Sequence, residues 1–166
     1  MLTIDRISIS APIDRVFTAA RDVDQWPTIL PHYRWVRFLE RRAGGGGGVV
    51  EMAAWRPFGW RRATLRWPAW WVSEMAVDPA RGEIRYRHLR GITRGMDVIW
   101  TVRGTEGTEA QRHRGTVEVE IIHTWDGPGW PLISRAAAAL VIGPVFVHGI
   151  ATRTLAGLKR FAEGGQ

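Results

Sequence analysis

The sequence contains no cysteine, and Lys159 is its only lysine. The absence of cysteine excludes disulfide bonds, thiolate metal ligands and thiol nucleophiles. Long hydrophobic runs are also absent: the longest apolar stretch, residues 136–147, is shorter than the roughly 20 residues that a membrane-spanning helix needs. The N-terminal stretch MLTIDRISIS lacks the basic region and apolar core of a signal peptide. We therefore expect a cytoplasmic protein.

Acidic residues are outnumbered, with 16 Asp and Glu against 23 Lys and Arg and a formal net charge of +7. A basic balance is one mark of a nucleic-acid-binding protein. However, the arginines are spread over nearly every segment and alternate with Trp, Leu and Glu instead of forming a basic run. That pattern is typical of solvated strand faces, so we expect no nucleic-acid partner.

Tryptophan, in contrast, is abundant, with 10 residues in the chain. Trp67, Trp70 and Trp71 all stand within the segment LRWPAWWVSEMAV at 65–77. Indole rings are large and amphipathic, so they either fill a core or form the wall of a site for a flat hydrophobic molecule. Composition alone leaves both alternatives open.

Hydrophobic periodicity predicts a strand, two short helices, six further strands and a long final helix. Residues 2–10 alternate as a strand does, and residues 13–20 carry an apolar face at helical spacing. A second short helix is expected around DQWPTIL, ending before Pro31. Short turns between the later strands favour an antiparallel sheet and an α+β fold. Those strands are predicted at 33–41, 49–55, 60–77, 83–90, 96–103 and 111–125, and the final helix at 131–163.

The glycine run at 44–48 lacks the Lys-Ser/Thr pair that follows the glycines of a phosphate-binding loop. We therefore interpret it as the loop of a β-hairpin.

The final helix has two dissimilar halves. Leu155, Leu158 and Ala162 share an inward face, whereas 136–150 is apolar on all sides. Several alternatives would explain this apolar segment. Residues 136–150 could contact neighbouring loops, a second copy of the chain or a membrane surface, or form a gate over a pocket. Pro144 is expected to kink the helix at Gly143-Pro144.

The segment APIDRVF…DVDQWPTILPH, followed by the β-meander and the final helix, resembles the START-like, or helix-grip, superfamily. Within it the chain is similar to the polyketide cyclase/dehydrase group over essentially its whole length. The resemblance implies one domain, residues 1–166. It also implies a curved antiparallel sheet of about seven strands wrapped around a long C-terminal helix, with a deep pocket between them. Ligand carriers, lipid-binding proteins and aromatase/cyclases share this fold, so the fold alone does not choose among them.

The inward-facing positions of the predicted strands combine aromatic rings with a few polar groups, which is the usual composition of a small-molecule site. We therefore predict an internal cavity that binds a hydrophobic molecule of aromatic, polyketide-like, isoprenoid or lipid type. Its predicted lining residues are Trp26, Tyr33, Trp67, Trp71, Ser73, Met75, Tyr86, His88, Trp100, His123, Trp125, His148 and Thr152.

Two interpretations of this cavity remain open: binding and carriage of the ligand, or cofactor-free acid/base chemistry as a polyketide aromatase/cyclase or dehydratase. For catalysis the candidates are His88, His123 and Tyr86, because a cyclase or dehydratase needs only a general base and orienting donors. The resemblance matches Trp26 and Tyr33 to pocket residues of the aromatase/cyclases. It places Met75 where those enzymes have a pocket arginine. No nucleophile elbow, metal-ligand spacing or cofactor motif is present in the sequence, so we expect no metal and no cofactor.

Overall fold

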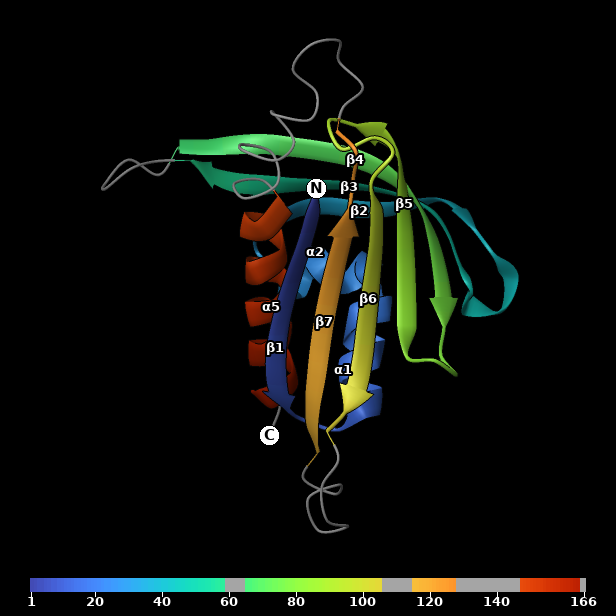
Figure 1. Ribbon diagram of the computed structural model, residues 1–166, viewed down its shortest axis with the longest axis vertical. Helices are drawn as coiled ribbons and strands as arrows, with labels where there is room; N and C mark the ends of the chain where they lie inside the picture. Colours follow the sequence, from blue (N-terminus) through green and yellow to red (C-terminus); the bar gives the residue numbers. More distant parts are fainter. Residues whose placement is uncertain (59–64, 106–114, 128–146, 165–166) are drawn as a thin grey trace.

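A computed structural model describes residues 1–58, 65–105, 115–127 and 147–164 of the chain (Figure 1). The order of elements confirms the predicted α+β fold. The elements are β1 (Leu2–Ser10), α1 (Ile13–Arg21), η1 (Val23–Gln25), α2 (Trp26–Ile29), β2 (Tyr33–Arg41), η2 (Ala43–Gly45), β3 (Gly47–Phe58), β4 (Leu65–Asp78), β5 (Glu83–Gly91), β6 (Asp97–Gly104), β7 (Thr116–Thr124) and α5 (His148–Glu163).

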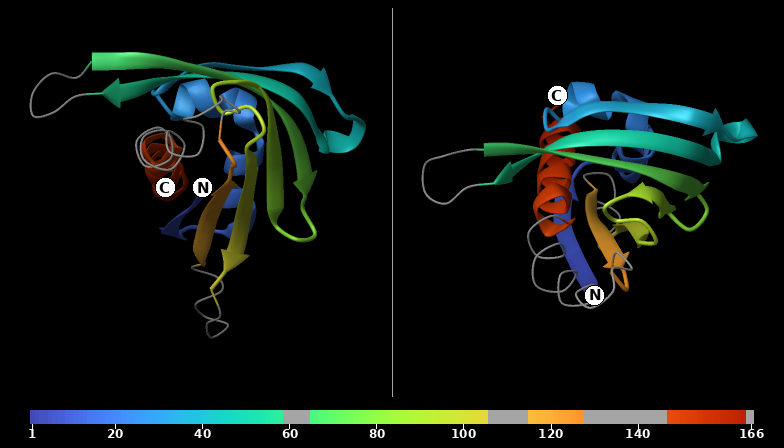
Figure 2. Two further views of the ribbon diagram at one scale, coloured as in Figure 1. Left: turned by 45° about the horizontal axis from the view of Figure 1, so that its top comes forward. Right: turned by 90° about the horizontal axis from the view of Figure 1, so that it is seen from above.

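The strands form one antiparallel sheet in the order β1-β7-β6-β5-β4-β3-β2. Strands β2 to β7 follow one another as neighbours in the sheet. The α1, η1 and α2 segment separates β1 from β2 in the chain, and β1 pairs with β7 at the opposite edge of the sheet from β2. The sheet bends strongly, and α5 lies on its concave side (Figure 2). This arrangement is the predicted helix-grip fold.

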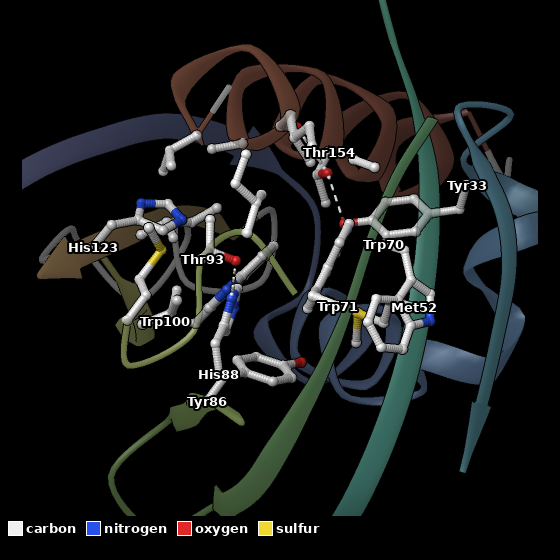
Figure 3. Close-up of a pocket in the computed structure, with 18 of the residues that line it drawn as sticks. Tyr33, Met52, Trp70, Trp71, Tyr86, His88, Thr93, Trp100, His123 and Thr154 are labelled. Carbon is white, nitrogen blue, oxygen red and sulfur yellow. Dashed lines mark hydrogen bonds between the residues drawn. The ribbon is translucent and has the colours of Figure 1, made fainter. Parts of the chain in front are cut away.

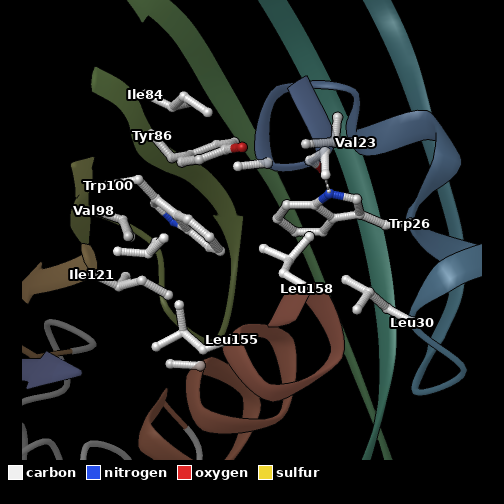
Figure 4. Packing of buried hydrophobic residues seen from close by; sticks show 14 of the residues in the cluster. Val23, Trp26, Leu30, Ile84, Tyr86, Val98, Trp100, Ile121, Leu155 and Leu158 are labelled. Carbon is white, nitrogen blue, oxygen red and sulfur yellow. Dashed lines mark hydrogen bonds between the residues drawn. The ribbon is translucent and has the colours of Figure 1, made fainter. Parts of the chain in front are cut away.

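Strand alternation sorts the side chains as predicted. Ile84, Trp100 and Ile121 lie side by side on neighbouring strands and are at most 5% exposed. These rows face the short helices and α5 and make the core (Figure 4). The outer face carries ion pairs such as Arg87 with Asp97, which join the same strands on the solvent side. The alternation therefore gives β5 and β6 an apolar inner face and an outer face that carries charged side chains.

The described part of α5 packs through Ala151, Leu155, Leu158 and Ala162, all at most 5% exposed. Three of these residues are the inward face predicted from the sequence. The predicted kink at Gly143-Pro144 lies outside the described residues. None of the described helices is long and apolar enough to cross a bilayer.

Replacing Gly157 on α5 with alanine should destabilise the protein. A Cβ at this position would lie 2.3 Å from Cδ2 of Leu30, a fully buried side chain. Overpacking of this kind costs about 1–3 kcal/mol. Gly149, on the same helix, has no heavy atom within 4 Å of an added Cβ, so Gly149→Ala should instead stabilise by about 0.5–1 kcal/mol. Urea unfolding of both variants measures the difference, and equal effects would contradict the close packing of α5 on Leu30.

The glycine run is shared between a turn and a strand, which differs from the predicted loop at 44–48. Gly44 and Gly45 have positive φ and open surroundings. Gly47 and Gly48 already belong to β3, where a Cβ would meet the backbone oxygens of Met75 and Glu40 at 2.2 and 2.0 Å. Strand β3 therefore begins earlier than predicted because only glycine permits this close approach of backbones.

Candidate ligand-binding site

A cavity of about 90 Å³ lies between α5 and the concave face of the sheet (Figure 3). Side chains from α2, β2 to β7, the β5–β6 turn and α5 surround it. The described residues that line it are Trp26, Tyr33, Met52, Ala69, Trp70, Trp71, Tyr86, His88, Ile92, Thr93, Met96, Val98, Trp100, Ile121, His123, Val147, Ile150, Ala151 and Thr154.

Aromatic rings in mutual contact form the walls of this cavity. The ring of Trp26 meets that of Tyr33 edge-on, with centroids 5.0 Å apart, and lies 5.6 Å from the ring of Trp100. Trp71 is 6.2 Å from Tyr33 and stacks on His88 at 6.1 Å with an interplanar angle of 11°. Ring pairs at these separations attract one another, so the walls present fixed flat surfaces to a ligand.

A short chain of hydrogen bonds holds one side of the cavity. The hydroxyl of Thr154 on α5 lies 3.3 Å from the hydroxyl of Tyr33 and 3.0 Å from Nε2 of His32. It also donates to the backbone oxygen of Ile150. Burial raises the pKa of the Tyr33 phenol above its ordinary value. These bonds fix α5 to β2 across the cavity.

On the other side of the cavity, only some of the polar groups have hydrogen-bond partners. Nδ1 of His88 lies 2.6 Å from the Thr93 hydroxyl, and Nδ1 of His123 lies 3.3 Å from the Thr3 hydroxyl. The hydroxyl of Tyr86 is buried and has no hydrogen-bond partner among the described residues. A buried hydroxyl without a partner is costly, so the site offers Tyr86 Oη to a bound molecule.

No described side chain around the cavity carries a formal charge at neutral pH. Desolvation lowers the pKa of His123 to about 4, and desolvation together with the neighbouring His123 lowers the pKa of His88 to about 3. Burial raises the pKa of Tyr86 well above its ordinary value. Both imidazoles and the phenol are therefore neutral. The cavity favours an uncharged guest, because an ion buried there would lack a counterion.

Seven of the residues predicted from the sequence lie together around this cavity: Trp26, Tyr33, Trp71, Tyr86, His88, Trp100 and His123. Trp70 is 41% exposed, as its outward parity predicts, and its Nε1 donates to Glu51. It nevertheless borders the cavity as well. The side chain of Trp67 lies outside the described residues, although its backbone pairs with Arg56.

Five other predicted residues do not line the cavity. Ser73 and Met75 do face inward on β4 and are buried, but they lie beyond the cavity. The ring of Trp125 is buried elsewhere, with its Nε1 donating to the backbone oxygen of Arg94. His148 and Thr152 lie on the side of α5 that faces β1. They were predicted at the boundary of the inward face, within reach of a ligand, and instead contact Asp5 on β1.

Asp5 on β1 explains the position of His148. Its carboxylate is buried and accepts a hydrogen bond from Nδ1 of His148, while the Thr152 hydroxyl lies 3.5 Å away. Desolvation raises the pKa of Asp5, and His148 partly offsets that effect. These polar groups therefore join α5 to the edge strand instead of facing the cavity.

Two polar lining residues, Thr154 and Thr93, were absent from the prediction. Thr154 could have been found, because it lies three residues after Ala151 and four before Leu158 on the inward helical face. Thr93 stands in the turn between β5 and β6, where sequence periodicity gives no signal.

The fold is START-like: a curved antiparallel sheet wraps around a C-terminal helix, and an aromatic cavity lies between them. Residues 9–140 match the family described as polyketide cyclase / dehydrase and lipid transport. The chain belongs to this family.

One relative in sequence agrees with that assignment, and two solved structures share the fold. A Streptomyces halstedii protein described as "Putative polyketide cyclase" is 32% identical over 104 residues, which are 62% of this chain and 88% of that protein. The fold is similar to that of a START superfamily protein from Mycobacterium smegmatis, with a TM-score of 0.68, 11% identity and 99% of both chains covered. It is also similar to Zhui aromatase/cyclase from Streptomyces sp. R1128, with a TM-score of 0.65, 21% identity, and 99% of this chain and 98% of that chain covered.

Proposed function

We propose that this protein binds and carries an uncharged, flat hydrophobic molecule in the aromatic cavity. The observation that carries the proposal is an aromatic-walled cavity, neutral throughout its described lining, that contains the buried and unpartnered hydroxyl of Tyr86. Flat rings suit an aromatic or polyketide-like guest. The Tyr86 hydroxyl suits a guest with one hydroxyl or keto group. The family description, which names polyketide cyclases and lipid transport, supports a ligand of this class.

Cofactor-free cyclase or dehydratase chemistry is the second candidate, because His88, His123 and Tyr86 all border the cavity. A general base works best when its pKa lies near the operating pH. The pKa of His88 is lowered to about 3 and that of His123 to about 4, so both imidazoles are weak bases. This favours a role in orienting and binding the guest, and binding is therefore the first proposal.

We propose that this binding takes place in the cytoplasm. The proposed partner is a small molecule and not a nucleic acid. Eight arginines of the described part of the chain pair with carboxylates, which supports their role as solvated surface charges. They are Arg6, Arg21, Arg37, Arg41, Arg42, Arg81, Arg85 and Arg87. The proposed membrane or dimer contact through 136–150 falls mainly on residues outside those described.

Titration with naphthol and with naphthoate tests the proposal, using quenching of tryptophan fluorescence as the signal. Naphthol, which is neutral, should bind saturably. Naphthoate should bind at least about tenfold more weakly, a difference of about 1.4 kcal/mol, because its ring-bound carboxylate would enter a cavity whose described lining has no cation. Equal or tighter binding of naphthoate, or no saturable binding of naphthol, would contradict the proposal.

The Tyr86→Phe variant should show how much the hydroxyl contributes to binding, apart from the ring. The variant should bind naphthol several-fold more weakly than the wild type, because the hydrogen bond to the guest is lost. Naphthalene, which cannot make that bond, should bind both proteins equally. Removing an unsatisfied buried hydroxyl should leave stability unchanged or raise it by up to about 1 kcal/mol. A parallel loss of naphthol and naphthalene affinity would mean that Tyr86 acts only through packing.

A further inference from the structure

Three tryptophans of the sheet have outward parity. Trp35 on β2, Trp55 on β3 and Trp70 on β4 lie on three neighbouring strands. Trp70 is 41% exposed, and the other two are partly exposed. Large aromatic side chains that gather on one exposed face mark an interaction site. We call this region the outer tryptophan surface, and its members are Arg34, Trp35, Arg37, Trp55, Trp70 and Arg90.

The rings of this surface shield smaller side chains on the same face of the sheet. Trp35, Ala53 and Trp70 form one row across β2, β3 and β4. Ala53 is 1% exposed and Val72, also of outward parity, is 3% exposed. Figure 2 shows α5 and the short helices on the inner side of these strands, and no described helix covers the outer side. Tryptophan and arginine side chains are therefore the layer that excludes water here.

Hydrogen bonds and ring contacts hold this layer in place. Nε1 of Trp70 donates to the carboxylate of Glu51 at 2.8 Å. The guanidinium carbon of Arg34 lies 4.4 Å from the centre of the Trp55 ring and 5.8 Å from that of the Trp35 ring. A guanidinium this close to two indole rings is attracted to both. The surface is thus ordered before a partner arrives, which lowers the entropic cost of docking.

The outer tryptophan surface carries a surplus of positive charge. Arg37 is paired with Glu51. Arg34, in contrast, is exposed and pairs with no carboxylate of the described part of the chain. Arg90, which lies beside Val72 on β5 and is exposed, has no such partner there either. Two unpaired arginines attract an anionic partner, and they oppose the approach of a second copy of the same surface.

We propose that the outer tryptophan surface docks the protein on an anionic lipid bilayer. Tryptophan is enriched where lipid headgroups meet the acyl chains, and each arginine near an anionic membrane surface adds to the attraction. Trp70 belongs to this surface and also borders the aromatic cavity. The docked protein would therefore hold its cavity beside a bilayer, in which hydrophobic molecules accumulate. The docking goes beyond the proposed function, and only the transfer of a guest rests on that function.

Flotation with lipid vesicles tests this proposal. The wild type should float with vesicles of phosphatidylcholine mixed with phosphatidylserine, and far less with vesicles of phosphatidylcholine alone. Added salt should weaken the binding, because it screens the arginines. Arg34→Gln should lower the affinity for the anionic vesicles about fivefold, the effect of one arginine near an anionic membrane surface.

Arg103→Gln is the matched control for Arg34→Gln. Arg103 is also exposed and pairs with no carboxylate of the described residues, but it lies on β6, which β5 separates from β4. This variant has the same change of charge and should bind the anionic vesicles much as the wild type does. Equal losses in the two variants, or equal flotation of the wild type with neutral and anionic vesicles, would overturn the docking surface.

Trp35→Ala should weaken vesicle binding several-fold, because one ring of the surface is removed. If this variant does not fold, as judged by urea unfolding, the two arginine variants decide. A dimer in solution that Trp35→Ala dissociates would assign the surface to a second copy of the chain and overturn the proposal. A wild type that binds naphthol but no vesicles would overturn it as well and leave the proposed function standing. Vesicle binding without naphthol binding would do the reverse.

Discussion

Acidification below about pH 6.5 should destabilise the protein. The pKa of His123 is lowered from 6.5 to about 4 and that of His88 to about 3 by burial, so the unfolded chain takes up protons on these residues more readily than the native one. The contribution of these buried neutral imidazoles to the free energy of unfolding is therefore complete above about pH 6.5, and it is lost as the pH falls toward about 4. For the well-buried His123 the loss at about pH 5 is on the order of 2 kcal/mol.

Urea unfolding at a series of pH values measures this loss, and His123→Asn is the variant that isolates it. The variant should have a flatter dependence of unfolding free energy on pH between about 6.5 and 4. The pKa of Asp5 is raised above its ordinary value of 3.8 by burial, so protonation of this carboxyl acts in the opposite direction, and the comparison with His123→Asn isolates the histidine contribution. An unchanged slope in His123→Asn would show that this imidazole is accessible to protons in the native state.

Trp71→Ala should cost the protein about tenfold in affinity for naphthol. Trp71 borders the cavity, meets the Tyr33 ring edge-on and stacks on His88, so its removal takes away one flat wall. Ring contacts contribute about 0.5–1.5 kcal/mol beyond the area that they bury. Stability should fall by less than the roughly 3–5 kcal/mol typical of a fully packed aromatic residue, because one side of the ring already faces a cavity. Fluorescence quenching and urea unfolding measure the two effects.

Trp35 is the matched control for this experiment. It lies on the outer face of the sheet, with its ring 5.8 Å from the guanidinium carbon of Arg34, and it does not line the cavity. Trp35→Ala should leave naphthol binding unchanged. If Trp71→Ala unfolds the protein while the wild type binds no flat hydrophobic probe, the tryptophan-rich segment is core and the cavity has no binding role.

Strand alternation accounts for the part of the candidate site that the sequence predicts. Tyr86 and His88 on β5, Trp100 on β6 and His123 on β7 all follow the period of two, and each borders the cavity. This period is a local property of the backbone, so it can be read without knowing which strands pair.

The failures arise where the position depends on packing between distant segments. Ser73 and Met75 have the predicted inward parity, but they follow a register irregularity between Val72 and Ser73 on β4 and do not line the aromatic cavity. His148 contacts Asp5, a residue 143 positions away in the chain that lies on the edge strand β1. No periodicity within the last helix encodes the position of β1, so the sequence could not distinguish the face toward β1 from the face toward the cavity.

A crystal structure of the protein with naphthol bound tests the central claim most directly. The account predicts the naphthol ring against Trp71 and Trp100, with its hydroxyl within hydrogen-bond distance of Tyr86 Oη or His88 Nε2. Naphthol bound on the outer face of the sheet, with the rings around the cavity closed on one another, would contradict the account.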